Sequence, residues 1–439
     1  MKAFIKNLLM SLVLPFTWVI VQYNLKHNFF AESYADVGIC LLGLGCIHSC
    51  LILLRMPARI IVVLWLILIW PSFHLSLALD LLCRFVLFLG LMAICKKVKL
   101  GLINFVLVIL CVMNGAQIIQ RHFHAKRTAQ HFVCEPTHKA PIALTGNIYF
   151  ILCDAYAGRE VLSRYYQFDN NAFYENLQKL GFNAQDGKVT YRPVNGFPTL
   201  KALNYFTNLG QLKVTELSPL QLHFTLKGSC LFAALKHCNY GAWGTNTRFA
   251  FLQNLGLKPM GPKHFYTALQ LVYCCLRQNN CLEAWLKRCL NSQLYRQELA
   301  VFAYLQNEFV PSTTGKNFYY FHIDCPHAPF VFDERGGFND DQVVKIWGEN
   351  EVGPSAYSRE TYRANYVRQL QTLNRQLLAL MVSLIEKDPQ ATIILQGDHG
   401  TFMTNDQDEN AAFMFAVRLS LPANHVHPAN FFKEFIYGE

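Results

Sequence analysis

Two apolar segments far apart in the chain each end in side chains that can bind a metal ion. The first, at 147–153, leads directly into Asp154. The second, at 392–396, is followed one residue later by Asp398 and His399. Short apolar runs are typical of buried strands, and α/β enzymes place their chemistry at the carboxyl ends of such strands. Carboxylates and imidazole bind divalent ions, so the sequence predicts a divalent metal site.

A site of this kind needs a nucleophile, and Thr199 is the best candidate. It follows Pro198 and begins a segment with a helical pattern. Backbone N–H groups at a helix start face an incoming anion, and a metal ion lowers the pKa of a hydroxyl group. The alternative is a threonine that only caps the helix.

Two histidines belong to a third segment with strand character, at 318–323. His322 lies within the strand, and His327 follows on a loop stiffened by Pro326 and Pro329. Both could hold a charged group over the metal ion, which makes them candidate substrate-binding residues. For His322 the alternative is a hydrogen-bonded core histidine.

Alternating strand-like and helix-like segments must position these residues. Helices are predicted at 172–180, ended by Gly181, and at 362–386, where leucines recur at helical spacing. This alternation predicts an α/β fold with a mostly parallel sheet covered by helices. The segment 211–311 is interpreted only as helices and loops.

The first 120 residues are a series of apolar runs broken by basic clusters, within a chain that is 52% hydrophobic and 15% charged. We predict membrane spans at about 7–23, 37–54, 59–76, 78–95 and 100–119. Pro71, and Asp80 with Arg84, interrupt one long apolar stretch that holds the third and fourth spans, so a total of four spans is an alternative. Basic residues flank alternate loops, which predicts a cytoplasmic amino terminus and an extracytoplasmic domain. The predicted organisation is a transmembrane domain at 1–120, a linker at 121–144 and a catalytic domain at 145–439.

Charge and cysteine usage add two expectations. The formal net charge of +10 fits basic cytoplasmic loops, and no basic, aromatic-rich motif suggests nucleic acid. In an oxidising compartment Cys230 with Cys238, or Cys281 with Cys289, would be plausible local disulfides.

In chain order, these motifs resemble the sulfatase-like branch of the alkaline phosphatase superfamily. The matching segments cover about 147–206 and 317–400. The layout of spans before the domain is similar to that of membrane-anchored phosphoethanolamine transferases and lipoteichoic acid synthases. The resemblance implies an alkaline-phosphatase-like α/β/α sandwich. The motifs are Asp154-x-Tyr156, Thr199 before a helix, His327-x-Pro329-Phe330 and Gln396-x-Asp398-His399-Gly400.

The resemblance also implies roles for residues. It makes Asp154, Thr199, Asp398 and His399 the ligands of zinc or manganese. Thr199 becomes the nucleophile, and His327 a histidine on the substrate side. Three departures stand out: many relatives have Glu in place of Asp154, the Cys/Ser-x-Pro-x-Arg signature of sulfatases is absent, and 401–410 lacks the histidine usual in phosphoethanolamine transferases.

The function expected is that of a metal-dependent phosphotransferase in the cytoplasmic membrane, with its catalytic domain in the periplasm. Its partners would be a phospholipid donor and a lipid or glycan acceptor, and the protein would be a monomer. The alternatives are a sulfatase-like hydrolase of phosphate or sulfate esters and a catalytically silent binding protein. Transfer or hydrolysis, and one ion or two, remain open at this point.

Overall fold

A computed structural model describes residues 100–129, 146–191, 193, 198–209, 212–245, 257–262, 280–313, 316–340, 358–404, 406–419 and 431. The chain divides into two compact units, which are Met1–His124 with Phe265–Leu290, and Ala125–His264 with Asn291–Glu439. Every predicted site residue lies in the second unit.

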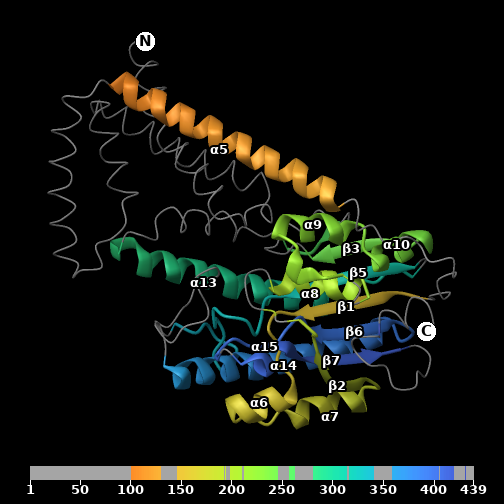
Figure 1. Ribbon diagram of the computed structural model, residues 1–439. Coiled ribbons are helices and arrows are strands. Elements are labelled where there is room, and N and C mark those ends of the chain that lie inside the picture. The colour runs from red at the N-terminus through yellow and green to blue at the C-terminus, as the bar shows by residue number, and fades with distance from the viewer. Residues whose placement is uncertain are drawn as a thin grey trace. The chain divides into compact units, whose positions relative to one another are not determined.

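A seven-stranded sheet forms the centre of the second unit (Figure 1), with the strand order β2-β7-β6-β1-β5-β3-β4. The strands from β6 to β4 in this order run parallel, and β7 is antiparallel to both β6 and β2. The prediction of a mixed α/β fold with a mostly parallel sheet is therefore confirmed. The strands are β1 (Ile148–Cys153), β2 (Asn183–Lys188), β3 (Gly241–Thr245), β4 (Lys258–Met260), β5 (Asn317–Ile323), β6 (Thr392–Gly397) and β7 (Ala412–Arg418).

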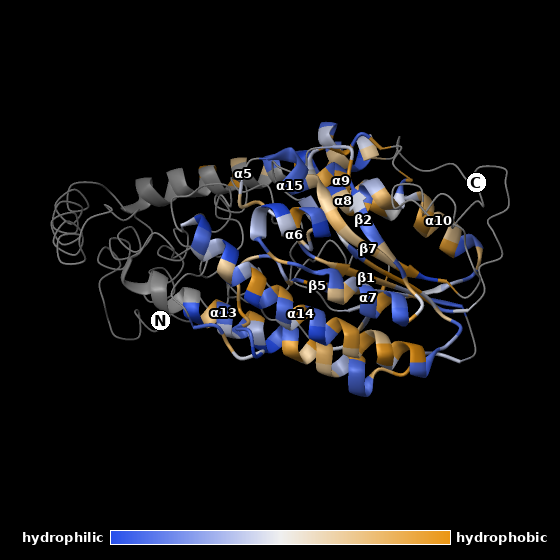
Figure 2. Ribbon diagram, turned by 90° about the horizontal axis from the view of Figure 1, so that it is seen from below, coloured by the Kyte–Doolittle hydropathy of each residue, from blue (hydrophilic) through white to orange (hydrophobic). Residues whose placement is uncertain are grey.

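The three central strands, β1, β5 and β6, are buried at every residue. They read as nearly continuous apolar runs because helices cover both faces of the sheet. Figure 2 shows α7 and α14 on one face and α8 and α9 on the other. The helices are α5 (Leu100–Ala129), α6 (Arg159–Tyr166), α7 (Asn171–Lys179), α8 (Pro198–Thr207), α9 (Pro219–Lys227), α10 (Cys230–His237), α13 (Asn280–Ala303), α14 (Arg359–Lys387) and α15 (Gln407–Ala411), with a 3-10 turn η3 (Val214–Glu216) and a π-helical turn η4 (Tyr304–Glu308).

The two helices expected from sequence are present. α14 begins after Ser358, whose hydroxyl accepts a hydrogen bond from the Thr361 N–H. Its leucines at 370, 373, 377, 380 and 384 are at most 1% exposed and form the predicted buried face. α7 ends just before Gly181, which adopts the left-handed conformation (φ 85°) that favours glycine.

Other expectations were wrong. The segment 211–311 contains the strands β3 and β4 as well as helices. Cys230 is disulfide-bonded, but Cys238 and Cys289 are free thiols, so neither predicted local pair forms. Cys230 begins α10 and Cys238 caps its end, and Cys281 and Cys289 both lie in α13, so each pair is separated by eight residues of helical rise, about 12 Å. A disulfide requires Cα atoms within about 7 Å, which explains the result.

The predicted transmembrane domain is only partly described. The first four spans lie outside the described residues, and the fifth falls within α5, which continues to Ala129 and so enters the predicted linker. Among the helices that the structure describes, none combines the length and the hydropathy that a membrane crossing requires. The membrane anchor therefore stays a prediction.

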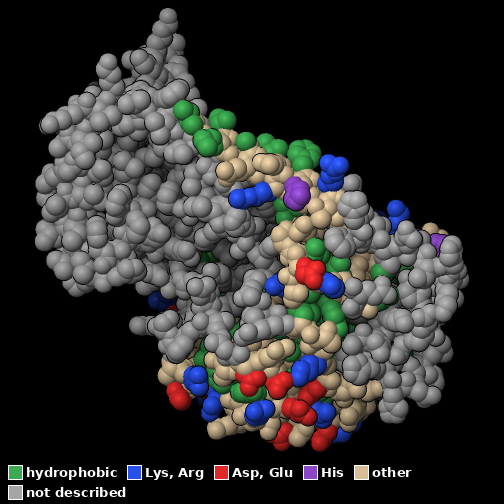
Figure 3. Space-filling view, viewed as in Figure 1, with side chains coloured by type: hydrophobic (Ala, Val, Ile, Leu, Met, Phe, Trp, Pro, Cys, Tyr) green, Lys and Arg blue, Asp and Glu red, His purple; other side chains and the backbone are tan. Residues whose placement is uncertain are grey.

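Charged side chains of both signs are interspersed on the visible face of the second unit. In Figure 3 acidic and basic groups alternate over the region of α6, α7 and α14, at the bottom of the view. This region therefore shows no basic stripe of the kind that binds nucleic acid.

Candidate metal centre

Three neighbouring parallel strands each end on an aspartate. Asp154 follows β1, Asp398 follows β6 and Asp324 follows β5. The pairing aligns the last residue of β1 with the last residues of β6 and β5, so the three aspartates lie at the same level of the sheet. Adjacent strands are about 4.8 Å apart. The fold therefore places three carboxylates side by side at the carboxyl edge of the sheet.

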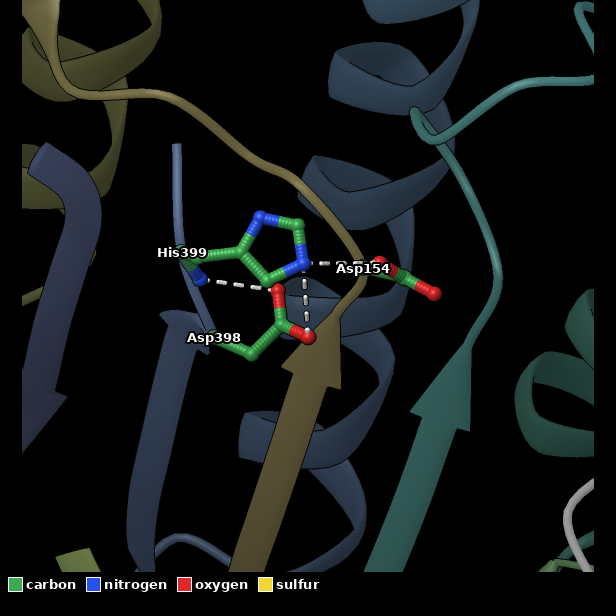
Figure 4. Close-up of side chains that lie close together, drawn as sticks. All are labelled: Asp154, Asp398 and His399. Carbon is green, nitrogen blue, oxygen red and sulfur yellow. Dashed lines mark hydrogen bonds and ion pairs between the residues drawn. The ribbon is translucent and has the colours of Figure 1, made fainter. Parts of the chain in front are cut away.

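Asp154, Asp398 and His399 form a compact cluster (Figure 4). The His399 Nε2 atom lies 3.5 Å from Asp154 Oδ1 and 3.4 Å from Asp398 Oδ2. All three residues are fully buried. Buried charges are paired or coordinate metals, so this arrangement is suited to a cation between the groups.

The orientation of the His399 ring supports a metal ligand. Its Nδ1 atom lies 2.6 Å from the carbonyl oxygen of Gly400, which can only accept, so we assign the proton to Nδ1. In the neutral ring, Nε2 then directs its lone pair at two carboxylates. Donors about 2.0–2.1 Å from a tetrahedral ion are about 3.3–3.4 Å apart. The observed separations match this value, so the residues fit a divalent ion.

The two oxygens of Asp398 have different surroundings. Oδ1 accepts hydrogen bonds from the backbone N–H of Ala155 (2.9 Å) and of His399 (2.8 Å). Oδ2 has no hydrogen-bond partner within the described part of the chain, and it is the oxygen that faces His399 Nε2. The carboxylate is therefore held by one oxygen and offers the other to an ion.

The turn after Asp154 is held in an unusual conformation. Ala155 has φ 59°, which is uncommon for a residue with a side chain. The Tyr366 hydroxyl donates to the Ala155 carbonyl (2.9 Å) and accepts from the Ala157 N–H (3.2 Å). Together with the bond from the Ala155 N–H to Asp398, these contacts fix the direction in which Asp154 leaves the strand.

A buried carboxylate holds the loop that follows His399. Glu409 is fully buried and accepts hydrogen bonds from Tyr166, Thr401, Met403 and Thr404. The Phe402 ring lies 4.8 Å from the His399 ring, measured between centroids. No sequence motif singled out Glu409, because its role depends on which loop it folds against.

Thr199 is the second residue of α8, as predicted. It is 1% exposed, and its Oγ1 atom has no hydrogen-bond partner among the residues described. A satisfied helix-cap hydroxyl would show such a partner, so this observation favours a hydroxyl reserved for a ligand. The candidate metal cluster comprises Asp154, Asp398 and His399, and Thr199 as a further ligand is a proposal.

The two predicted histidines lie at different places. The His327 N–H donates to the Asp154 carbonyl (3.0 Å), and its ring centroid lies 6.4 Å from that of His399. His327 Nδ1 contacts the Ala328 carbonyl oxygen. His322 instead pairs with Asp324, at 3.3 Å between Nε2 and Oδ1.

Cys153, next to Asp154, is a buried free thiol. Burial raises the pKa of the Cys153 thiol well above its usual value, and the carboxylates of Glu298, Asp398 and Asp154 raise it further. The thiol therefore stays protonated at neutral pH, which disfavours a role as a nucleophile.

Comparisons with known proteins add a fold-level similarity. No protein-family model matches the sequence, and no curated protein does. Among solved structures, the C-terminal periplasmic domain of EcEptC from Escherichia coli, in complex with Zn, is 12% identical with a TM-score of 0.41, covering 70% of this chain and 86% of that one.

Two further similar structures are named as transferases. Phosphoglycerol transferase GacH of Streptococcus pyogenes, in complex with sn-glycerol-1-phosphate, is 10% identical with a TM-score of 0.38, covering 73% of this chain and 80% of that one. The soluble domain of lipooligosaccharide phosphoethanolamine transferase A of Neisseria meningitidis is 10% identical with a TM-score of 0.35, covering 68% and 87%.

Proposed function

We propose that this protein is a metal-dependent phosphotransferase of the sulfatase-like branch of the alkaline phosphatase superfamily. The observation that carries the proposal is the buried Asp154, Asp398 and His399 cluster, in which His399 Nε2 faces two carboxylate oxygens at 3.4–3.5 Å. These groups would hold zinc or manganese. The ion supplies positive charge that favours ionisation of a hydroxyl and stabilises the phosphoryl oxygens.

Two side chains of the protein act as the nucleophile and the proton donor. Thr199 Oγ1 attacks the phosphorus atom of a phosphodiester head group, and the bond from phosphorus to the lipid alcohol breaks. His327 Nε2 delivers a proton to that leaving oxygen. The acceptor hydroxyl then gives its proton to His327 Nε2 and attacks the phosphorus atom, and the bond from phosphorus to Thr199 Oγ1 breaks, which restores both side chains.

Burial supports transfer over hydrolysis. Thr199 is 1% exposed and His327 is 6% exposed, so bulk water has little access to these two side chains. An acceptor hydroxyl that is bound and oriented competes well with water under such conditions. We propose a phospholipid donor and a lipid or glycan acceptor, and a monomeric protein.

We further propose a multi-pass membrane anchor, with the catalytic domain at 145–439 outside the cytoplasm. Val112, Met113 and Phe123 on α5 are 65%, 55% and 66% exposed, which supports an apolar environment around this helix. The disulfide at Cys230 supports an oxidising compartment such as the periplasm.

A lipid with a fluorescent head group tests the function. The full chain should release or transfer the labelled head group with Mn²⁺ or Zn²⁺ and lose this activity with a chelator. Thr199→Ser should keep part of the activity because the oxygen remains, and Thr199→Ala should lose nearly all of it. Full turnover by Thr199→Ala would reject the mechanism, and a wild type that is inert with either metal would favour a silent binding protein.

A further inference from the structure

Tyr191 lies in the loop that leads from β2 to α8, the helix that carries Thr199, and the mechanism above gives it no role. Its ring packs against the ring of Tyr205 on α8, with 5.3 Å between the centroids. The residue as a whole is partly exposed, but its hydroxyl oxygen is buried and has no hydrogen-bond partner among the described residues. A buried hydroxyl without a partner is rare in native proteins, so this one needs an explanation.

The sheet places this loop at the edge that carries the metal cluster. β2 and β6 are each antiparallel to β7, so they run in the same direction and end at the same edge. In the register, Gln185 and Gln396 both pair with Phe415. Tyr191 therefore lies past the end of β2, at the same edge where Asp398 follows β6. The two strands are two spacings apart, about 9–10 Å, so a long side chain after β2 can reach a group bound at the end of β6.

Backbone hydrogen bonds hold this loop beside the segment that follows His399. The Val189 N–H donates to the Ala411 carbonyl at 3.0 Å, and the Gly400 N–H donates to the Asn410 carbonyl at 2.8 Å. Both segments are thus tied to adjacent residues at the end of α15. The loop after β2 therefore has a fixed place relative to the metal cluster.

The Tyr191 hydroxyl is also coupled electrostatically to the site. Burial raises the pKa of this hydroxyl well above its usual value, and the Asp398 carboxylate and then Tyr205 raise it further. The group therefore stays protonated and can donate a hydrogen bond to an anion. Asp398 Oδ2, His399 Nε2 and Thr199 Oγ1 likewise have no hydrogen-bond partner within the described part of the chain. A neutral donor suits this setting because, unlike a lysine or an arginine, it does not form an ion pair with a metal-binding carboxylate.

We propose that the Tyr191 hydroxyl donates a hydrogen bond to a non-bridging oxygen of the phosphoryl group during its transfer to Thr199. The inference rests on the proposed function and adds a catalytic residue to it. Charge in phosphoryl transfer is spread over the three equatorial oxygens. A donor that is already in place stabilises this charge without having to reorganise.

Orthovanadate, which can adopt the five-coordinate geometry of a phosphoryl group in transfer, is the probe that tests the inference. Calorimetric titration of the metal-loaded full chain should show that Tyr191→Phe binds orthovanadate about 100-fold more weakly than the wild type. With the lipid donor, kcat should fall by a similar factor, while KM and the metal content stay unchanged. The melting temperature without vanadate should equal or exceed that of the wild type, because the substitution removes a buried hydroxyl that has no partner.

Tyr205→Phe is the matched control. It removes a hydroxyl from the neighbouring ring, but that hydroxyl accepts a hydrogen bond from Thr190 Oγ1 at 3.1 Å. The control should therefore melt at a lower temperature than the wild type and keep its vanadate affinity and kcat.

The outcomes separate this inference from the proposed function. Equal vanadate affinity in the wild type and Tyr191→Phe would overturn the inference and leave the proposed function intact. A Tyr191→Phe variant that melts below Tyr205→Phe, or does not fold, would show a structural hydroxyl and overturn it as well. A wild type that binds vanadate but turns over no lipid donor would overturn the proposed function, and the vanadate affinity of Tyr191→Phe would still decide whether Tyr191 binds the phosphoryl group. A wild type that does neither would overturn both.

Discussion

Glu409→Gln is expected to destabilise the loop that carries His399. Glu409 Oε1 accepts hydrogen bonds from Thr401 Oγ1 (2.6 Å) and the Met403 N–H (2.9 Å), and Oε2 accepts from the Thr404 N–H (2.7 Å). A glutamine keeps the shape but replaces one oxygen with an NH₂ group. Hydroxyl groups can rotate to adapt to this donor, whereas a backbone N–H cannot.

Either orientation of the new amide therefore leaves one backbone N–H facing a donor. A buried unsatisfied group costs about 1–3 kcal/mol, and the loss of the charge weakens the remaining bonds by about 1 kcal/mol. We expect a total loss of about 2–4 kcal/mol in the free energy of unfolding. For a domain of this size each kcal/mol lowers the melting temperature by roughly 2–4 °C.

Thermal unfolding of the purified chain, followed by tryptophan fluorescence, measures this loss. Asp408→Asn is the matched control, because Asp408 neighbours Glu409 but is 61% exposed and pairs with Lys188 at the surface. Such a pair contributes about 0–1 kcal/mol. Equal melting temperatures for the two variants would refute the reasoning. Metal affinity should also fall about 10–100-fold in Glu409→Gln alone.

Three further predictions concern the site and the topology. Gly400→Ala should destabilise the chain more than Glu409→Gln, because an added Cβ would lie 1.9 Å from the Glu409 carbonyl oxygen; a melting temperature equal to the wild type would contradict this. Asp398→Ala should contain less bound metal per chain than the wild type when measured by elemental analysis, and an unchanged metal content would show that Asp398 is not a ligand. A membrane-impermeant thiol reagent should label Cys238 or Cys289, two partly exposed thiols, on intact cells. If the reagent labels these thiols only after the cells are lysed, the domain lies in the cytoplasm and the predicted topology is wrong.

The sequence predicted the elements that carry long apolar patterns. The central strands β1, β5 and β6 each bury a continuous apolar run, and the helix α14 buries an apolar stripe. Such a pattern can be recognised within a single segment, without knowledge of the segments that pack against it. β3 and β4 could not be found in this way. Gly241–Thr245 and Lys258–Met260 are short, contain Gly or Pro and have no alternating pattern. β3 forms because β5 supplies a paired edge, and β4 forms because β3 supplies the next one.

Some residues of the site could be predicted from the sequence, and others could not. Asp398 and His399 came together with Asp154 because all three directly follow recognisable strands. Asp324 also follows such a strand, but its importance appears only when the registers of β5 and β1 are known. Glu409 gave no signal, because its hydrogen bonds depend on the path of the loop at 400–404.

Mass spectrometry of the Thr199 peptide tests the central claim most directly. After incubation of the metal-loaded full chain with a phospholipid donor and no acceptor, the peptide should gain the mass of the phosphorylated head group on Thr199. The adduct should disappear when an acceptor is added, and it should be absent from Thr199→Ala and from Asp398→Ala. Turnover of the donor with an unmodified Thr199, or an adduct on another residue, would contradict the account.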